Sequence, residues 1–460
     1  MEVLAKGIVR RRSILLLAAL ALSSFTPALW AATYYVDQNH PAASDANSGT
    51  ADKPWSTLYR AMEADLKPGD SVLVKEGRYL IDRGGAWNQP AISPRGSGTA
   101  DRPITIKAVP RHGVELLGKG GDAPLIGSFR QHHIVIDGFV VSNPGVKGIG
   151  VFGTAGQRAR GVVIQNNIVR GIYIDNSDNA DGIRIERASG AIVRNNRIHD
   201  VSNAARSSNA AGIKLYWSDN ILIENNEIFD VVAGIKEKEN GEFIDVRRNY
   251  VYDCSFGIEI MNQNSLTTQS YRVYENIFDC GTGVESKTVS SATMKDIYIY
   301  NNVFANYTAK AVNGTKHGSN RRIWNNIFYR PGGAPTQGEF VTYNDPPREI
   351  ELMDYNLYYQ DPKNVIGLYD SNRTFNGLAA WQGSGFGANS KVADPMFMDA
   401  AGGDFRLAPQ SPARGAGRVD GRSSGAAVDM GAYPREGTVV GLMWSGSNSL
   451  PAAPQQLSVE

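Results

Sequence analysis

The sequence predicts an all-β solenoid. Two observations predict it: a run that recurs at intervals of 22 to 30 residues, and a strand-like alternation of apolar and polar residues within each run. Each run begins with Gly followed by Ile or Val, and its apolar residues lie two places apart, as in a strand with one buried face. The runs begin at Gly182, Gly212, Gly234, Gly257 and Gly283. Since several strands and no helix fill each interval, we expect a β-helix.

The outward positions of these runs form charged columns. Stacking places equivalent residues of successive coils about 4.8 Å apart. The first column is Arg184, Lys214, Lys236, Glu259 and Glu285, and the second is Glu186, Tyr216, Lys238, Met261 and Lys287. One coil earlier the equivalent positions are Gly150 and Phe152. We therefore expect the chemistry to begin after that coil.

A second motif recurs at similar intervals, an Asn two places before an apolar residue. It occurs at Asn166, Asn196, Asn226, Asn249, Asn301 and Asn325, with Glu275 as the exception. A buried Asn at a turn can hydrogen-bond the coils above and below it. We predict a structural ladder in which Asn196, Asn226 and Asn249 stack as one internal column.

The repeats resemble those of the right-handed parallel β-helix proteins of the pectate-lyase-like superfamily, over residues 33–435. Within them, the run from Gly257 to Ser265 is similar to the calcium-ligand and catalytic-lysine run of the chondroitinase B and alginate lyase family. Asn264 stands where that family has its lysine; of its two paired glutamates one is present, and Ile258 stands in the place of the other. The resemblance implies a single-stranded right-handed parallel β-helix and an activity on polysaccharides.

The two ends of the chain differ from the repeats. Residues 1–31 carry three consecutive arginines, a short apolar run and a small-residue site, as a secretory signal does, and the run is too short to span a membrane. We expect a secreted or periplasmic protein without a membrane anchor, a β-helix domain over residues 33–435 and a flexible tail over 436–460. Ser56 or Thr57 can cap a helix with Leu58, Ala61 and Met62 on one face, which would cover the first coil.

The charge balance bears on the partner. The formal net charge is +1, and removal of residues 1–31 takes away four cations and one Glu, which leaves 1 − 3 = −2. This balance does not imply nucleic acid, and an acidic ligand must be attracted by a local patch. We expect a monomer.

The charged columns predict a groove for an acidic polysaccharide and its cleavage by β-elimination. That reaction needs a cation for the carboxylate, a base for the neighbouring carbon acid and a donor for the leaving oxygen. We assign the base to Lys236, because Lys214 and Lys238 beside it would lower its pKa, and we expect its side chain to point to solvent. Arg184 is the permanent cation and Tyr216 a second acid or base. Substrate binding is assigned to Lys238, Glu259, Glu285 and Lys287.

Three alternatives stay open. Glu259 and Glu285 stand one coil apart, near the separation of about 5 Å between the carboxyl groups of retaining glycosidases. A β-helix that binds polysaccharide without cleaving it would use the same groove. The Lys and Glu residues would otherwise only pair across coils as a solvated ladder.

A calcium site is a further hypothesis. The stretch from Asp175 to Glu186 partly fits a calcium loop, with Asp181 and Glu186 as candidate ligands, although Ala180 occupies the position where a Gly allows the sharp turn. Asp and Asn are also ordinary turn formers. This loop and the insertion Ser202–Ala210 come at the same edge of successive coils, so together they would form one wall of a cleft.

Cys254 and Cys280 each lie three residues before the Gly of their coil. Stacking places them within disulfide distance, and export favours oxidation. A stacked pair of buried thiols is the alternative, and neither arrangement makes them catalytic.

Overall fold

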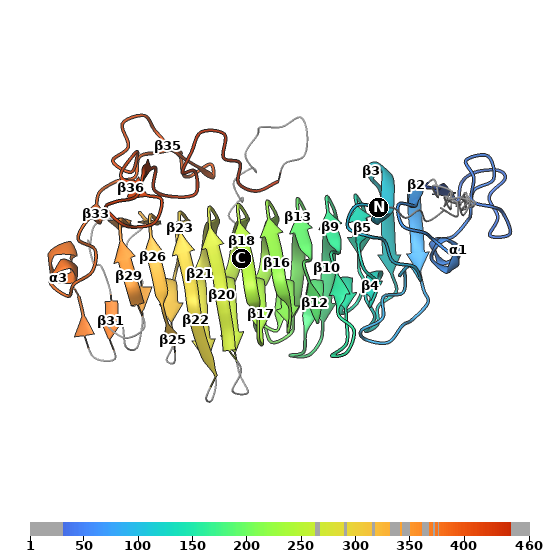
Figure 1. The fold of residues 1–460 in the computed structure, drawn as a ribbon, viewed down its shortest axis with the longest axis horizontal. Helices are drawn as coiled ribbons and strands as arrows, with labels where there is room; N and C mark the ends of the chain where they lie inside the picture. The colour runs from blue at the N-terminus through green and yellow to red at the C-terminus, as the bar shows by residue number, and fades with distance from the viewer. Residues whose placement is uncertain are drawn as a thin grey trace, which may run out of the picture. The chain divides into compact units, whose positions relative to one another are not determined.

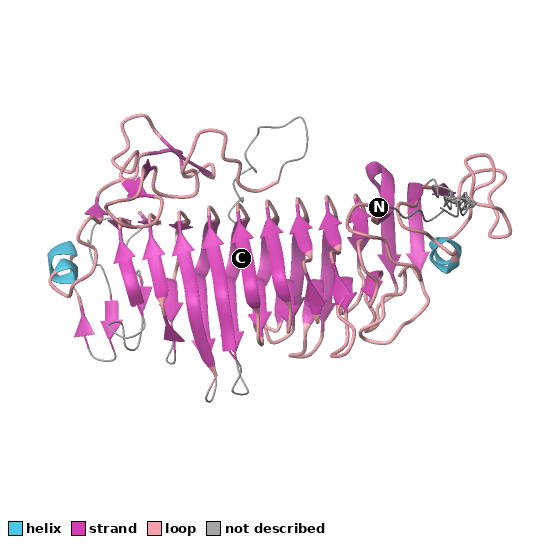
Figure 2. Ribbon diagram, in the orientation of Figure 1, coloured by secondary structure: helices cyan, strands magenta, loops and turns pink. Residues whose placement is uncertain are grey.

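The computed structural model describes residues 31–262, 267–288, 292–314, 318–331, 341–342, 350–360, 368–370, 373–375 and 377–442. The chain divides into two compact units, Met1–Trp30 and Ala31–Glu460. All but the last residue of the predicted signal therefore lies outside the described residues. Within these ranges the regular secondary structure is almost entirely strand, apart from the short helices α1 (Leu58–Glu63) and α3 (Leu378–Gln382) (Figures 1 and 2). None of the described helices has the length and apolar character that a membrane crossing requires.

Each coil pairs in parallel with the coils before and after it, and the strands form three stacks. Stack A, which holds the Gly-led runs, contains β4 (Ile126–Phe129), β7 (Lys147–Phe152), β11 (Ala180–Glu186), β15 (Ala210–Tyr216), β17 (Glu227–Lys238), β19 (Tyr250–Asn262), β21 (Ile277–Thr288), β24 (Lys310–Gly314), β28 (Val341–Thr342) and β31 (Leu368–Asp370). β31 also pairs antiparallel with β32 (Arg373–Thr374). The long strands β17, β19 and β21 begin in stack C and continue into stack A.

Stack B contains β1 (Thr33–Val36), β2 (Ser71–Ile81), β3 (Ile104–Gly118), β5 (Ile134–Asp137), β9 (Val163–Gln165), β13 (Ile192–Arg194), β16 (Asp219–Glu224), β18 (Glu242–Arg247), β20 (Thr267–Tyr274), β22 (Thr293–Tyr300), β26 (Arg321–Trp324) and β29 (Ile350–Asp354). The short strands β8 (Ala159–Arg160), β12 (Ala188–Ser189) and β25 (Gly318–Ser319) join its edge. Stack C contains the second part of β3, then β6 (Val140–Ser142), β10 (Ile168–Ile174), β14 (Arg197–Asn203), the first parts of β17, β19 and β21, and β23 (Val303–Ala305), β27 (Ile327–Arg330), β30 (Leu357–Gln360) and β33 (Lys391–Val392).

The register confirms the first of the two predicted charge columns. Arg184 pairs with Lys214, Lys214 with Lys236, Lys236 with Glu259, and Glu259 with Glu285. Gly150 precedes Arg184 in this column, as the sequence predicts. The inward residues of the same strands are fully buried and pack as one apolar core along the solenoid.

The N-terminal cap also follows the prediction. The Thr57 side chain accepts a hydrogen bond from the Arg60 amide at 3.2 Å, which satisfies one of the free N–H groups at the start of α1. Leu58, Ala61 and Met62 are buried in the core. The helix therefore contributes its apolar face to the first coils.

The Asn ladder is present, but part of its predicted membership is wrong by one residue. Each ladder amide accepts hydrogen bonds at 2.9–3.1 Å from the backbone N–H and the side-chain amide of the preceding ladder Asn. The members are Asn167, Asn196, Asn226, Asn249, Asn276, Asn302, Asn326 and Asn356. The predicted stacking of Asn196, Asn226 and Asn249 is thus confirmed.

The misassigned positions Asn166, Glu275, Asn301 and Asn325 lie one residue earlier, with left-handed φ angles of 53–58°. Asn tolerates this conformation better than most residues. At these corners the first Asn of a pair therefore makes the left-handed turn, and the second joins the hydrogen-bonded ladder. In most of these coils both residues fit the sequence motif, which is why the spacing alone misplaced the column. Asn276 also completes the ladder at the coil where Glu275 had seemed to interrupt it.

A C-terminal segment, residues 394–442, packs on the outside of stack C. It contains the antiparallel pairs β34 (Phe397–Asp399) with β35 (Asp404–Leu407), and β36 (Gly417–Arg418) with β37 (Ala427–Val428). Its Phe405, Met430 and Val440 form a second core with outward residues of the coils. The Asn225 and Asn301 side chains hold it by donating to the Val439 and Asp429 carbonyls at 3.0 and 2.9 Å. Residues 436–442, expected to be flexible tail, therefore belong to this packed segment, and 443–460 lie outside the described residues.

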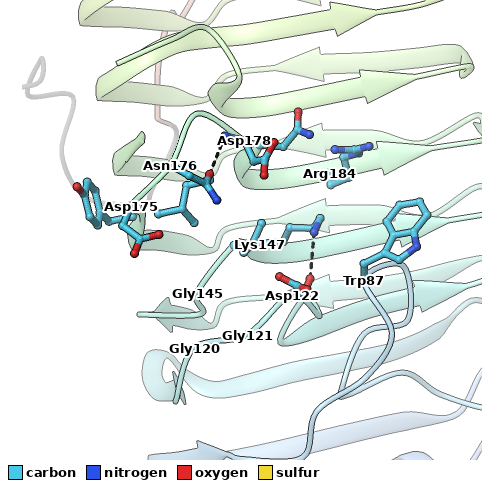
Figure 3. Close-up of a pocket in the computed structure, with 14 residues that line it drawn as sticks. Trp87, Gly120, Gly121, Asp122, Gly145, Lys147, Asp175, Asn176, Asp178 and Arg184 are labelled. Carbon is cyan, nitrogen blue, oxygen red and sulfur yellow. Dashed lines mark hydrogen bonds between the residues drawn. The ribbon is translucent and has the colours of Figure 1, made fainter. Parts of the chain in front are cut away.

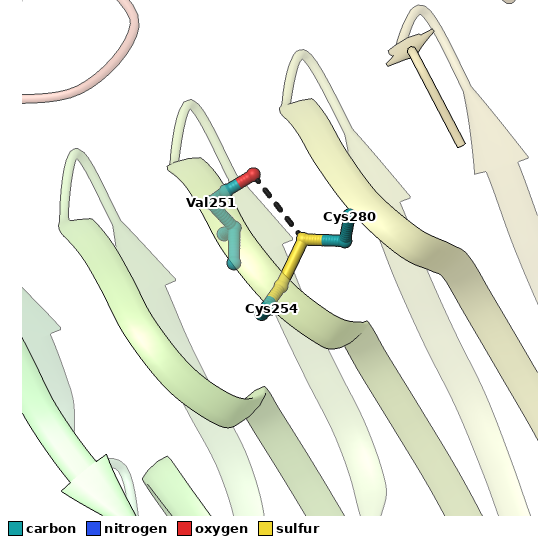
Figure 4. Close-up of a disulfide and its surroundings, with 3 residues drawn as sticks. All are labelled: Val251, Cys254 and Cys280. Carbon is teal, nitrogen blue, oxygen red and sulfur yellow. Dashed lines mark hydrogen bonds between the residues drawn. A yellow bond between two sulfur atoms is a disulfide. The ribbon is translucent and has the colours of Figure 1, made fainter. Parts of the chain in front are cut away.

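Cys254 and Cys280 form a disulfide between consecutive coils (Figure 4). Their Cα atoms are 4.8 Å apart, which is the spacing of paired strands. Of the two alternatives that the sequence left open, the disulfide is correct.

Candidate functional site

A pocket of about 740 Å³ opens on the outer face of stack A, at the coils of β7 and β11 (Figure 3). It is lined by Trp87, Gly120, Gly121, Asp122, Gly145, Val146, Lys147, Tyr173, Ile174, Asp175, Asn176, Asp178, Asn179 and Arg184. The loop after β2 supplies Trp87, two tight turns supply the glycines, and the loop between β10 and β11 supplies the wall from Asp175 to Asn179. This loop forms a wall of the pocket, but the insertion Ser202–Ala210, which was expected to share that wall, is not among the lining residues.

Lys147 and Arg184 bring positive charge to the floor of the pocket. The Lys147 ammonium donates to the Asp122 carbonyl at 3.0 Å. Burial lowers the pKa of Lys147, and Asp181, its neighbour in the strand register, opposes that shift. Arg184 donates to Asp181 at 2.9 Å and to Glu186 at 2.8 Å, and its guanidinium lies 3.9 Å from the centre of the Tyr216 ring. Burial works to lower the pKa of Arg184, but these anions raise it, so Arg184 stays charged.

Lys214, on the next coil, contacts residues of the pocket floor but does not line the pocket. Its side chain is fully buried, its ammonium contacts the Asp181 carboxylate and the Asn209 carbonyl, and it donates to the Asn179 amide oxygen at 3.0 Å. Burial lowers the pKa of Lys214 to about 7, with Asp181 acting in the opposite direction. For the buried Asp181, burial raises the pKa, yet Lys214 and Arg184 outweigh that effect and lower it. Asp181 therefore remains ionised out of water, whereas Lys214 titrates near neutral pH.

The expectation that Lys236 points to solvent is wrong. Only 2% of the residue is exposed, because the insertion after β14 folds over it and its ammonium donates to Ser208 at 2.8 Å. The same ammonium contacts Glu259 at 2.6 Å. Burial lowers the pKa of Lys236, Glu259 opposes this, and Lys287 and Lys238 add a smaller lowering. The predicted effect of Lys238 is present, but burial is the larger cause.

Glu259 and Glu285 do not form an open pair of catalytic carboxylates. Glu259 is fully buried between Lys236 and Lys287, and both cations contact it. Burial favours a raised pKa for Glu259, but the two lysines outweigh it and lower the pKa. Lys287 also lies 3.6 Å from Glu285. A sugar could reach Glu259 only if these contacts opened.

Tyr216 and Lys238 each contact an Asn side chain of a neighbouring loop. The Tyr216 hydroxyl donates to the Asn179 amide oxygen at 3.3 Å, and Lys238 donates to the Asn209 side chain at 3.4 Å. Burial raises the pKa of Tyr216, so its hydroxyl keeps its proton. Its ring holds the Arg184 guanidinium, which makes Tyr216 a positioning residue in this geometry.

The candidate calcium ligands do not fit a cation as they stand. Asp181 is neutralised by Arg184 and Lys214, and Glu186 by Arg184 and Arg187, the latter at 2.5 Å. Calcium sites are built from oxygen ligands whose negative charge faces the ion. Within the described ranges, no group of three or more His, Cys, Asp or Glu side chains is arranged to hold a metal.

Sequence reasoning missed Lys147, Asp122, Tyr173 and Trp87. Lys147 precedes Gly148 as Asp181 precedes Gly182, so extending the repeat by one coil and reading the residue before each Gly would have paired them. The coil that looked poor in charge thus contributes to the pocket. Trp87 carried no signal, because it comes from a loop some 60 residues earlier in the chain than Lys147.

A buried carboxyl also departs from the apolar pattern of the inward positions. Glu237 occupies the place that Leu215 and Ile260 take in neighbouring coils, and it is fully buried inside the solenoid. Its carboxyl accepts hydrogen bonds from the Gly241 amide at 2.9 Å and the Thr268 hydroxyl at 3.4 Å. Burial raises the pKa of Glu237 to about 8, so this carboxyl is mostly protonated at neutral pH.

Comparison with known proteins agrees with this architecture. Residues 125–279 match the family described as the right handed beta helix region. The chain is a right-handed parallel β-helix. The β-helix resembles an uncharacterized protein, YwoF, of Bacillus subtilis strain 168, with 26% identity over 468 residues that cover 81% of this chain and 91% of that protein.

Solved structures show the same fold at low identity. The complex of XylC with xylose aligns with a TM-score of 0.51 and 11% identity, covering 89% of this β-helix and 99% of that chain. Pectate lyase Pel9A aligns with a TM-score of 0.49 and 15% identity, covering 88% and 96%. The family match confirms the predicted right-handed β-helix at the level of the fold.

Proposed function

We propose that this β-helix is an exported polysaccharide lyase that cleaves an acidic, uronic-acid-containing polysaccharide by β-elimination in the pocket of Lys147 and Arg184. The observation that carries the proposal is the pairing of a fixed guanidinium with a lysine whose pKa is lowered, both at the floor of one sugar-sized pocket. The volume lies within the range of about 300–1,000 Å³ that is typical of small-molecule sites. The fold relative that binds xylose supports a sugar ligand only by analogy of fold.

The proposed roles differ from those assigned on the sequence alone. Arg184 neutralises the carboxylate of the uronate, which makes the proton on the adjacent carbon more acidic. Lys147 in its neutral form accepts that proton, and the electron pair left on the carbon forms the new double bond as the bond to the leaving oxygen breaks. The protonated Lys147 then returns the proton to that oxygen. Lys236 is replaced as the base because its ammonium lies behind Ser208 and does not line the pocket.

The remaining charged residues shape the electrostatics of the floor. Asp181 holds Arg184 and Lys214 in place, and Tyr216 lies against the guanidinium. The Asp122, Asp175 and Asp178 side chains at the rim are exposed, so water and salt screen their repulsion of a polyanion. Lys147 and Arg184 are buried, and their attraction at short range is screened less.

Two further features support export. The disulfide is typical of a protein that matures in an oxidising compartment. The basic and apolar residues at the start of the chain have the order of a secretory signal.

The rim carboxylates favour hydrolysis as the second candidate. Two of Asp122, Asp175 and Asp178 would act as acid and nucleophile on a sugar bound between them. This pair would replace Glu259 and Glu285, of which Glu259 is fully buried and Glu285 lies beside Lys287.

The test is incubation of the mature protein with polygalacturonate, alginate, a glucuronan and neutral xylan. A lyase produces ultraviolet absorbance from the unsaturated product, whereas a hydrolase produces new reducing ends without it. We expect absorbance with at least one uronate polymer and its loss, by about 10²-fold or more, in Lys147→Met. Lys295→Met, which changes an exposed lysine on stack B, is the matched control and keeps full activity. Reducing ends alone, or no product from any polymer, would overturn the lyase assignment.

A further inference from the structure

Trp87 is an exposed aromatic residue held at the edge of the pocket. It leaves 48% of its surface in water, although a large apolar side chain is usually buried. Its ring meets Phe152 edge-on, with centroids 5.9 Å apart and planes at 87°. An edge-on contact leaves much of the indole surface open. The indole thus adds an apolar surface to a pocket that is also lined by charged and amide side chains and by Val146, Tyr173 and Ile174.

The position of Trp87 relates it to the cations. Figure 3 shows the indole on one side of the pocket, the wall of Asp175 and Asp178 on the other, and Lys147 and Arg184 between them. Gly120 and Gly121 lie on the lower side, both with positive φ and with open space where a Cβ would project. These two glycines therefore place no side chain in the way of a flat ligand on the indole.

The chemistry of a sugar ring fits this arrangement. A pyranose has faces of C–H groups that pack on an aromatic ring, while its hydroxyl and carboxylate groups project from the rim of the ring. A ring packed on Trp87 would direct a carboxylate at its edge toward Lys147 and Arg184. A non-sugar anion would use the cations but would gain nothing from the indole.

We propose that Trp87 is a substrate-binding residue on which a pyranose ring stacks, and that this stacking orients the carboxylate of the ring toward Arg184 and Lys147. The inference rests on the proposed function for the identity of the sugar, a uronate, but its physical basis is the aromatic surface beside the cations. It assigns to a loop of the first coils, residues 82–91, a direct part in specificity.

The experiment compares Trp87→Ala, Trp87→Phe and the wild type on a uronate polymer that the wild type cleaves, and on short oligosaccharides of the same sugar by calorimetry. Loss of a stacked aromatic side chain is expected to weaken binding by about tenfold. We expect KM and Kd to rise by this factor in Trp87→Ala while kcat changes less. In Trp87→Phe both constants should return part of the way to the wild-type values. Phe243→Ala, which removes an aromatic residue 54% exposed on stack B, is the matched control and changes neither constant.

The outcomes separate this inference from the proposed function. Cleavage by the wild type with unchanged KM and Kd in Trp87→Ala overturns the stacking role and leaves the lyase assignment standing. Binding of neutral xylo-oligosaccharides that weakens in Trp87→Ala, without cleavage of any uronate polymer, supports stacking and overturns the uronate assignment. A Trp87→Ala protein whose melting temperature falls together with its affinity, and whose affinity Trp87→Phe does not recover, shows that the ring only packs on Phe152 and also overturns the proposal.

Discussion

Lys214 and Asp181 form an ion pair in which both side chains are completely buried, the lysine on β15 and the aspartate on β11 of the preceding coil. Arg184 shares the same carboxylate. One anion thus stabilises two cations that the solenoid keeps out of water, and this arrangement fixes the guanidinium at the floor of the pocket. Its removal therefore tests both the stability and the electrostatics of the site.

Asp181→Asn is expected to destabilise the protein by about 3–5 kcal/mol, because two buried cations lose their counter-charge. Denaturant unfolding measures the change. Asp245→Asn is the control, since Asp245 pairs with Arg272 at the surface, where an ion pair contributes about 0–1 kcal/mol. Equal losses in the two variants would contradict the buried pair.

Lys236→Ala distinguishes a general base from a buried structural cation. A solvent-exposed base would lose about 10²–10⁴ in rate with the fold unchanged. The observed contact with Glu259 predicts instead a loss of stability of about 3–5 kcal/mol, because Glu259 would keep only Lys287 as a partner. Thermal unfolding and the lyase assay on the same preparation measure both effects. Full stability with no activity would restore Lys236 as the base.

The free energy of unfolding should fall as the pH rises from about 4.5 to about 8, because of Glu237. Its folded pKa of about 8 lies above the unfolded value of 4.5, so the folded state binds the proton more tightly. The stabilisation is complete below pH 4.5 and is lost as the pH rises through 8. The wild type should lose about 5 kcal/mol over this range relative to Glu237→Gln, whose amide does not titrate. Parallel pH profiles for the two proteins would show that Glu237 is not buried in its acid form.

Asn226→Ala should cost about 2–4 kcal/mol, because it leaves the buried Asn196 amide without its acceptor and breaks the ladder on both sides. Asn176→Ala, in an exposed turn, should cost less than about 0.5 kcal/mol. Urea unfolding of the two variants measures the difference. If the ladder did not contribute to stability, both variants would show the same small change in the free energy of unfolding.

Titration of the unfolded, unreduced protein should find no free thiol, since Cys254 and Cys280 are bonded. Replacing both with Ser should lower stability by about 3 kcal/mol, as expected for a disulfide that closes a loop of this length, 26 residues. Two titratable thiols would refute the bond.

The repeat made much of the fold predictable. Coils of 22 to 30 residues with apolar residues at alternate positions bury their apolar side chains by stacking on one another. Counting residues from the Gly of each coil was therefore enough to predict the pairing of Arg184, Lys214, Lys236, Glu259 and Glu285. The same counting brought Cys254 beside Cys280. Where two adjacent residues met the same criterion, as with Asn301 and Asn302, counting could not choose between them.

The sequence by itself determined which residues stack, because strand pairing repeats at every coil and depends only on local periodicity. The tertiary structure decided which of the stacked charges meet water. Ser208 and Asn209 belong to an insertion whose path no periodicity sets, and it buries Lys214 and Lys236. Trp87 lines the same pocket as Lys147 although it comes from a loop of the first coils, so the pocket is formed by segments far apart in the chain. Burial of an ion and closure of a pocket depend on what lies above the strand, and only the folded chain specifies that.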